Sequence, residues 1–230
     1  MPHYTNDLEV IESSLYNTNK LILHKTSDQR MYIIVKRIVD ILISAGGILL
    51  YLPVFIVIAI LIKLEDTKGT IFFKQVRVGK NGKPFNIYKI RSMVPNAEEL
   101  LPELAEKNEV KGAMFKIKDD PRVTRLGKFI RKTSIDEFPQ LWNVLKGDMS
   151  LVGPRPSLPR EVEQYSLYDS QRLVVTPGCT GLWQVSGRNE LHFKDMVELD
   201  LYYIQRRNLF FDIKLILKTF RVILFPKDTY

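Results

Sequence analysis

The chain has 230 residues and a hydrophobic fraction of 45%, which suits one folded domain with an appendage and excludes a largely disordered protein. Lysine and arginine exceed aspartate and glutamate by 34 − 26 = 8, which favours an anionic partner such as phosphate groups, nucleic acid or an acidic membrane surface. The single cysteine, Cys179, excludes an intrachain disulfide. The three histidines are far apart, so a metal here would be an oxygen-bound ion such as Mg²⁺.

The chain opens with a polar N-terminal extension, residues 1–31, which lacks the basic start and apolar run of a signal peptide. Within residues 32–66, the 22 residues from Ile41 to Ile62 carry no charge. As a helix they would extend roughly 33 Å, enough to cross the hydrocarbon core of a bilayer. One interpretation is therefore a single transmembrane helix.

A second interpretation is a re-entrant membrane helix that is broken at Pro53. Proline removes a helix hydrogen bond near the middle of the segment. Positive residues, which mark the cytoplasmic side of a span, stand at both ends: Lys36 and Arg37 before it, Lys63 and Lys68 after it. A segment that enters the membrane, bends and leaves on the same side satisfies both flanks, with arms of roughly 15–18 Å each.

The remainder, residues 67–230, is predicted to be a compact cytosolic domain. Asn81-Gly82 joins two runs rich in β-branched and aromatic residues, which predicts a β-hairpin of 71–78 and 83–90. Helices are expected over 95–107, 123–131, 134–145, 160–174 and 190–207, and loops over the proline-rich 152–159 and the glycine-rich 176–188. The predicted fold class is mainly α with a small β-hairpin (α+β).

The segment from Phe210 to Leu224 reads as an amphipathic helix. Three cations share one face: Lys214, Lys218 and Arg221. An apolar stripe lies opposite: Phe210, Ile213, Leu217, Phe220 and Leu224. Such a helix either covers a protein core or lies in the membrane interface, and the pattern fits both.

The adjacent acids Asp136 and Glu137 are one of four such pairs, and Glu137 has a plain structural reading. Ser134 would cap the 134–145 helix and Glu137 would close a capping box. The surroundings favour chemistry instead, because cations keep a carboxylate ionised and can hold a diphosphate. The cations that precede or follow the pair are Arg125, Lys128, Arg131, Lys132 and Arg155.

Two loops are further candidates for binding phosphate. Proline on both sides of Arg155 restricts the backbone that carries this guanidinium, although a structural turn with a solvated arginine has the same pattern. The loop 176–188 contains three glycines, a tryptophan and Arg188. It reads equally as the wall of a nucleotide pocket or as a packed loop.

Several motifs in order resemble the bacterial sugar transferases, and most closely the monotopic polyprenyl-phosphate sugar-1-phosphate transferases that begin exopolysaccharide, capsule and glycan assembly. The resemblance runs from about Lys36 to Leu224. Its motifs are Asp120-Pro121-Arg122-Val123-Thr124-Arg125-Leu126-Gly127-Lys128, Ser134-Ile135-Asp136-Glu137-Phe138-Pro139-Gln140-Leu141-Trp142-Asn143-Val144-Leu145 and Gly147-Asp148-Met149-Ser150-Leu151-Val152-Gly153-Pro154-Arg155-Pro156. Lys36-Arg37, Asp40, the mid-segment proline, Tyr88-Lys89 and the 177–188 loop also match. One departure is Leu52-Pro53, where many relatives have Ser-Pro.

The resemblance implies that Asp136 attacks the β-phosphorus of a UDP-sugar, so that UMP leaves and a sugar-phosphoryl aspartate remains. Undecaprenyl phosphate would then attack this intermediate and form a polyprenyl-diphospho-sugar. Glu137 would hold Mg²⁺. Arg131 and Arg155, with Lys89 and Arg188 as weaker candidates, would contact the phosphates.

The location that follows is the inner membrane of a bacterium, with the catalytic domain and both termini on the cytoplasmic side. The sequence leaves the oligomeric state open, a homodimer included, and no pattern selects among galactose, glucose and N-acetylated sugars. Two alternatives are a membrane-anchored nucleic-acid-binding protein and a non-catalytic assembly protein. The first lacks a familiar binding motif, and acids among its basic residues would repel a phosphate backbone, so no nucleic acid is expected as a partner.

Overall fold

The computed structural model describes residues 29–100, 102–107, 117, 119–186 and 191–224. Almost the whole N-terminal extension, and Arg188, lie outside these residues. The α-helices are α2 (Arg30–Glu65), α3 (Arg125–Lys132), α4 (Gln140–Lys146), α5 (Pro159–Val162), α6 (Leu182–Ser186), α7 (Phe193–Arg206) and α8 (Leu209–Leu224). The 3-10 helices are η2 (Lys80–Gly82), η3 (Pro102–Lys107), η4 (Ile135–Glu137) and η5 (Asp169–Val174), and the strands are β1 (Phe72–Val78), β2 (Pro84–Ile90), β3 (Ser150–Val152) and β4 (Gly178–Thr180).

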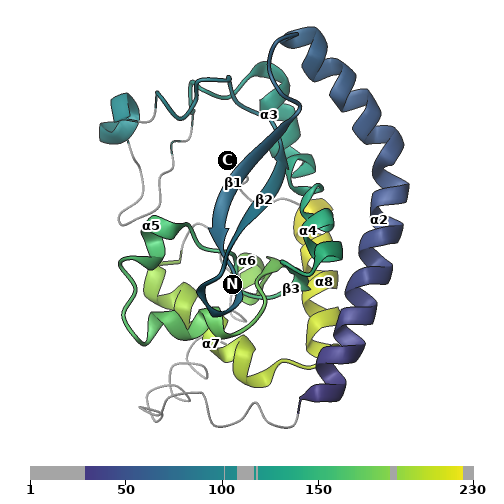
Figure 1. The fold of residues 1–230 in the computed structure, drawn as a ribbon, viewed down its shortest axis with the longest axis vertical. Helices are drawn as coiled ribbons and strands as arrows, with labels where there is room; N and C mark the ends of the chain where they lie inside the picture. Colours follow the sequence, from purple (N-terminus) through teal and green to yellow (C-terminus); the bar gives the residue numbers. More distant parts are fainter. Residues whose placement is uncertain (1–28, 101, 108–116, 118, 187–190, 225–230) are drawn as a thin grey trace.

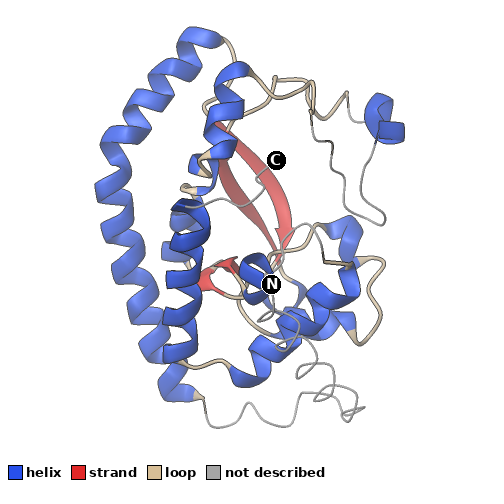
Figure 2. Ribbon diagram, turned by 180° about the vertical axis from the view of Figure 1, so that it is seen from behind, coloured by secondary structure: helices blue, strands red, loops and turns tan. Residues whose placement is uncertain are grey.

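The long helix α2 runs along one side of the molecule, and the other elements form a globular part beside it (Figure 1). The hairpin β1–β2 contacts α4 on one side and α5 on the other, and it stands between these helices in Figure 2. The predicted fold class, mainly helical with a small antiparallel hairpin, is confirmed.

The hairpin pairs Phe72 with Ile90 at its open end and Val78 with Pro84 beside the turn. Asn81 and Gly82 have φ angles of 57° and 77°, the left-handed backbone that the Asn-Gly pair predicts. The Asn-Gly signal was therefore correct, because the turn requires a conformation that few other residues adopt.

The prediction of a plain loop over 176–188 was wrong. Residues 178–180 form β4, which pairs in parallel with β3, and residues 182–186 form α6. The two strands approach so closely that a Cβ on Gly178 would lie 2.1 Å from the backbone nitrogen of Gly153. These glycines therefore serve close backbone packing, for which a local pattern gives no signal.

The prediction of one helix over 134–145, with Ser134 as its N-cap, was also wrong. Ser134 has a φ of 56° and its side chain makes no capping bond. The 3-10 turn η4 follows it, and α4 begins only after Pro139, because proline has no N–H with which to continue a preceding helix. Gly147 ends α4 as expected, with a φ of 92° and its N–H on the carbonyls of Asn143 and Val144.

Other predicted helices differ in extent. The expected helix 160–174 is divided into α5 and η5, and 95–107 contains turns followed by η3 instead of an α-helix. The helices expected at 123–131, 190–207 and 210–224 are confirmed as α3, α7 and α8, with boundaries that shift by at most three residues.

Helix α2 is the one helix of the described residues that is long and apolar enough to cross a membrane. It continues through Pro53 without interruption and bends in its second half, so the expected break is a bend (Figure 1). Only 11% of its most apolar 18-residue window is buried, and it presents a long row of exposed Ile, Leu and Val side chains.

The first half of α2 is bound to the globular part through polar groups. Lys36 Nζ lies 2.7 Å from a carboxylate oxygen of Asp212 on α8. Arg37 donates to the carbonyls of Val144 and Leu145 at the carboxyl end of α4. The buried Asp40 accepts a hydrogen bond of 3.0 Å from the Leu151 N–H on β3, which satisfies a charge that begins the apolar segment.

The second half of α2 packs against the same globular part. Ile58 and Ile62 form a buried cluster with Ile90 of β2 and Ile130 of α3. Just beyond the helix, Asp66 pairs with Arg91 at 2.6 Å. Both ends of the apolar helix are therefore attached to one domain.

The main hydrophobic core lies between α4, β3, α6, α7 and α8 and includes the fully buried Val144, Leu201, Tyr203 and Leu215. Helix α8 faces this core with Leu215. Its predicted apolar stripe is exposed instead at Phe210, Ile213, Leu217 and Phe220. Helix α8 therefore has a second apolar face that the described protein does not cover.

Candidate active site

The dyad Asp136–Glu137 lies on the short turn η4, between α3 and α4. Ser134, two residues before Asp136, adopts a left-handed backbone, which is costly for a residue with a side chain. Its carbonyl accepts from the Glu137 N–H at 3.2 Å, so the strained residue also closes the turn. The Asp136 side chain is 12% exposed, whereas the Glu137 side chain is 36% exposed. The turn thus buries one carboxylate and leaves the other accessible.

Lys89 on β2 connects the two carboxylates. Its Nζ lies 2.8 Å from Glu137 Oε1 and 3.8 Å from Asp136 Oδ2. Asn143 of α4 fixes this strand against the dyad, because its side chain accepts from the Tyr88 N–H and donates to the Asn86 carbonyl. The three charged groups are therefore held in register by buried hydrogen bonds.

The two acids titrate in opposite directions. Desolvation raises the pKa of Asp136 to about 6; Lys89 opposes this rise and Glu137 adds to it. Desolvation also acts on Glu137, but the positive charges of Lys89, Arg155 and Arg77 outweigh it and lower its pKa to about 2. Both carboxylates are therefore ionised at neutral pH, and Asp136 is the more basic of the two.

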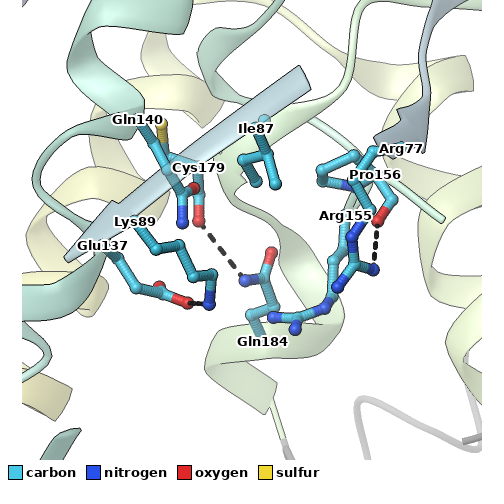
Figure 3. A pocket seen from close by; sticks show the side chains of 10 residues that line it. Arg77, Ile87, Lys89, Glu137, Gln140, Arg155, Pro156, Cys179 and Gln184 are labelled. Carbon is cyan, nitrogen blue, oxygen red and sulfur yellow. Dashed lines mark hydrogen bonds and ion pairs between the residues drawn. The ribbon is translucent and has the colours of Figure 1, made fainter. Parts of the chain in front are cut away.

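An open pocket lies in front of Glu137 and Lys89 (Figure 3). Arg155 and Arg77 face them from the other side, and the remaining lining residues are Ile87, Gln140, Pro156, Gly178, Cys179 and Gln184. Three cations surround one lining carboxylate, so the pocket has an excess of positive charge that suits an anionic ligand with two phosphates.

The structure brings together Asp136, Glu137, Lys89 and Arg155 from three separate parts of the sequence. Arg131 does not line the pocket; it is exposed on the last turn of α3, where its charge still acts on Asp136. Lys89, Glu137 and Arg155 therefore line the pocket, whereas Asp136 lies behind Glu137 on the same turn and Arg131 stands apart from it.

Arg77, a nearly buried arginine on β1, also lines the pocket and was not predicted from the sequence. It donates to the Pro156 carbonyl at 3.0 Å and, through two nitrogens, to Gln75 Oε1. Burial and the nearby Arg155 lower its pKa to about 10, so it remains charged at neutral pH. The hairpin register offered a signal: Lys89 pairs with Phe73, four residues before Arg77, so Arg77 and Lys89 share one face.

The donor set for Mg²⁺ is small. The described residues contain no cluster of three or more His, Cys, Asp or Glu side chains suited to a metal. Mg²⁺ is commonly held by one or two carboxylates together with substrate phosphates and water. The ionised, partly exposed Glu137 fits such a site when phosphates are present in the pocket.

The chain is similar in sequence to a family of known proteins. The family model described as "Bacterial sugar transferase" matches residues 31–226. The chain is 48% identical over 195 residues to the "Galactosyl transferase CpsE" of Streptococcus agalactiae serotype III, covering 84% of this chain and 43% of that protein. It is 41% identical to the "Undecaprenyl-phosphate galactose phosphotransferase" of Salmonella typhimurium, covering all of this chain and 48% of that protein.

A third relative is similar in length to the chain. The "Exopolysaccharide production protein ExoY" of Rhizobium meliloti is 39% identical over 85% of this chain and 88% of its own length. The chain thus spans about half the length of the first two relatives and most of the third. By the extent of these matches, the chain belongs to the bacterial sugar transferase family.

Proposed function

We propose that the chain transfers a hexose-1-phosphate from a UDP-sugar to undecaprenyl phosphate and releases UMP. The observation that carries this proposal is the buried Asp136, which has a raised pKa and lies beside an ionised Glu137 at a pocket lined by three cations. A relative named as an undecaprenyl-phosphate galactose phosphotransferase supports the substrate class.

The reaction would proceed in two displacements. An Asp136 carboxylate oxygen attacks the β-phosphorus of the UDP-sugar, and the bond from this phosphorus to the bridging oxygen breaks, so that UMP leaves with both electrons. An oxygen of the lipid phosphate then attacks the same phosphorus in the sugar-phosphoryl aspartate. This step releases the Asp136 carboxylate and forms the polyprenyl-diphospho-sugar.

The raised pKa of Asp136 suits a nucleophile, because a more basic carboxylate attacks more readily while remaining ionised at neutral pH. Lys89, Arg155 and Arg77 would hold the phosphate oxygens and stabilise the charge that develops on them. Arg131 would act at longer range through its charge, and Arg188 remains a candidate from the sequence alone.

Glu137 would serve as a ligand of Mg²⁺ together with the donor phosphates. The bound ion would supply positive charge that neutralises the leaving phosphate. The low pKa of Glu137 keeps this carboxylate ionised, as a metal ligand must be. The contact between Glu137 and Lys89 would weaken when the ion binds.

The proposed topology is monotopic, with the catalytic domain and both termini on the cytoplasmic side of the bacterial inner membrane. Lys36 and Arg37 at one end of α2, and Asp66 just beyond its other end, are bound to the same globular domain. If α2 crossed the bilayer, the globular domain that contacts it at both ends would have to lie beside it in the hydrocarbon core, where its polar surface would lose its water. The exposed stripe of α8 would lie in the interface beside α2, with Lys214 and Arg221 near anionic lipid heads.

The test uses purified protein, UDP-sugar labelled in the sugar and undecaprenyl phosphate. Asp136→Asn should abolish both UMP release and labelled lipid, because the amide cannot form the phosphoryl intermediate. Asp119→Asn, which changes an exposed carboxylate, should retain full activity. Full transfer by Asp136→Asn would exclude the covalent mechanism, and the absence of transfer by the wild type with every UDP-sugar would exclude the proposed function.

The topology has its own test. A cysteine placed at residue 2 should react with a membrane-impermeant maleimide only after the cells are broken. Labelling of this position in intact cells would contradict a cytoplasmic N-terminus.

A further inference from the structure

The backbone around Arg155 is bonded at almost every residue. The bonds are Gly153 N–H to the Thr180 carbonyl (2.9 Å), Gly178 N–H to the Pro154 carbonyl (2.8 Å), Arg77 to the Pro156 carbonyl (3.0 Å), Val78 N–H to the Ser157 carbonyl (2.9 Å) and Leu158 N–H to Glu161 (2.8 Å). Within the part of the chain that the structure describes, no such bond involves the backbone of Arg155, and its side chain extends into the pocket in Figure 3. The loop 153–158 therefore holds the Arg155 guanidinium on a backbone that is fixed by hydrogen bonds.

A series of hydrogen-bonded polar side chains connects this loop to the interior of the domain. The hydroxyl of Ser157, two residues after Arg155, lies 2.6 Å from the Tyr165 hydroxyl. Arg172 Nη1 donates to the same phenol oxygen at 3.1 Å, and Arg172 Nη2 is paired with Asp200 of α7. Ser157, Arg172 and Asp200 are all buried, so water competes little with these bonds.

The Tyr165 hydroxyl makes two hydrogen bonds. A guanidinium only donates, so the phenol oxygen accepts from Arg172, and either hydroxyl can donate in the bond between Tyr165 and Ser157. Burial raises the pKa of Tyr165, so the phenol keeps its hydrogen at neutral pH. The Tyr165 ring packs 5.5 Å from the Phe193 ring, and the Arg172 guanidinium lies over both rings. The phenol is thereby fixed at both its ring and its oxygen.

We propose that Tyr165, anchored by the buried Arg172–Asp200 pair, is a positioning residue that sets the place of the Arg155 guanidinium in the pocket by holding Ser157. Tyr165 does not line the pocket, so it acts through the loop and does not contact the substrate. The inference rests on the proposed function, in which Arg155 holds the phosphates of the UDP-sugar.

The first variant is Tyr165→Phe, which keeps the ring against Phe193 and removes the hydroxyl. The expected result is a fall of about tenfold in kcat/KM for the UDP-sugar, the equivalent of one hydrogen bond at the loop. The KM for undecaprenyl phosphate should stay within about twofold, because the lipid acceptor attacks after UMP has left. Tyr168→Phe is the matched control, since it removes a hydroxyl that bonds Glu198 on the surface, and it should leave kcat/KM unchanged.

A double-mutant cycle with Arg155→Ala separates positioning from general structural damage. If Tyr165 acts through Arg155, adding Tyr165→Phe to Arg155→Ala should change kcat/KM by less than about twofold. A further tenfold fall in that background would overturn the inference, as would unchanged kcat/KM in the single Tyr165→Phe variant.

Ser157→Ala breaks the same link from the loop side and should reproduce the effect of Tyr165→Phe, which keeps the inference testable if the latter variant does not fold. Full activity of Ser157→Ala would also overturn it. The proposed function is tested separately by Asp136→Asn. If the wild type is active and the Tyr165→Phe variant has the same kinetics, only the positioning role is refuted.

Discussion

The ionised Asp136 carboxylate should lower the free energy of unfolding of the protein at neutral pH. Its pKa rises from an ordinary 3.8 to about 6 on folding, so the folded state keeps a proton that the unfolded state releases. The contribution of this group to stability is complete below pH 3.8 and is lost as the pH rises through 6. At about 1.4 kcal/mol per pH unit, the loss at pH 8 is at most about 3 kcal/mol. Asp136→Asn, which cannot ionise, should therefore unfold at a higher temperature than the wild type.

The measurement is thermal unfolding in detergent with EDTA, so that no divalent ion binds the dyad. For a chain of this size the gain corresponds to a Tm increase of up to about 6–12 °C at pH 8 and about half of that at pH 5. Glu137→Gln is the control of opposite sign, because the pKa of Glu137 is lowered to about 2 and its charge stabilises the fold throughout this range. An Asp136→Asn variant whose Tm difference is the same at both pH values would refute the reasoning.

Three further outcomes are expected. Lys89→Met removes the cation shared by the dyad, so the pKa of Asp136 should rise further and the acid limb of the pH–rate profile should move to higher pH; an unmoved limb would contradict this. Arg77→Lys keeps the charge but loses the fork that bonds Gln75 and Pro156, and KM for the UDP-sugar should increase about tenfold in initial-rate assays, with exposed Lys80→Arg as an inert control. Asp40→Leu leaves the buried N–H of β3 without an acceptor and should cost about 1–3 kcal/mol, visible as a lower Tm, whereas unchanged Tm would show that this bond is dispensable.

The features that were predicted correctly are those that depend on neighbouring residues. The Asn81-Gly82 turn, Gly147 as the end of α4 and the amphipathic pattern of α8 each follow from a short stretch of sequence. The apolar segment of α2 was also visible as an uninterrupted run. Local backbone preference and hydrophobic period are enough to place such elements.

The features that were missed depend on contacts between distant segments. The pairing of β3 with β4 joins residue 150 to residue 178, and neither strand has a pattern of its own. Ser134 takes a left-handed conformation at the start of the turn that holds both carboxylates near Lys89, and the expected cap does not form. The dyad itself was identified through a family resemblance, since adjacent acids alone are common.

The ion pair between α2 and α8 has a consequence for the synthesis of the protein. Lys36 bonds Asp212, which is 176 residues later in the chain. At a synthesis rate of about 5–20 residues per second, the ribosome needs about 9–35 s to supply this partner. During that interval the Lys36 ammonium group still lacks the carboxylate that will hold it. The first half of α2 therefore completes its attachment to the domain only after α8 has been made.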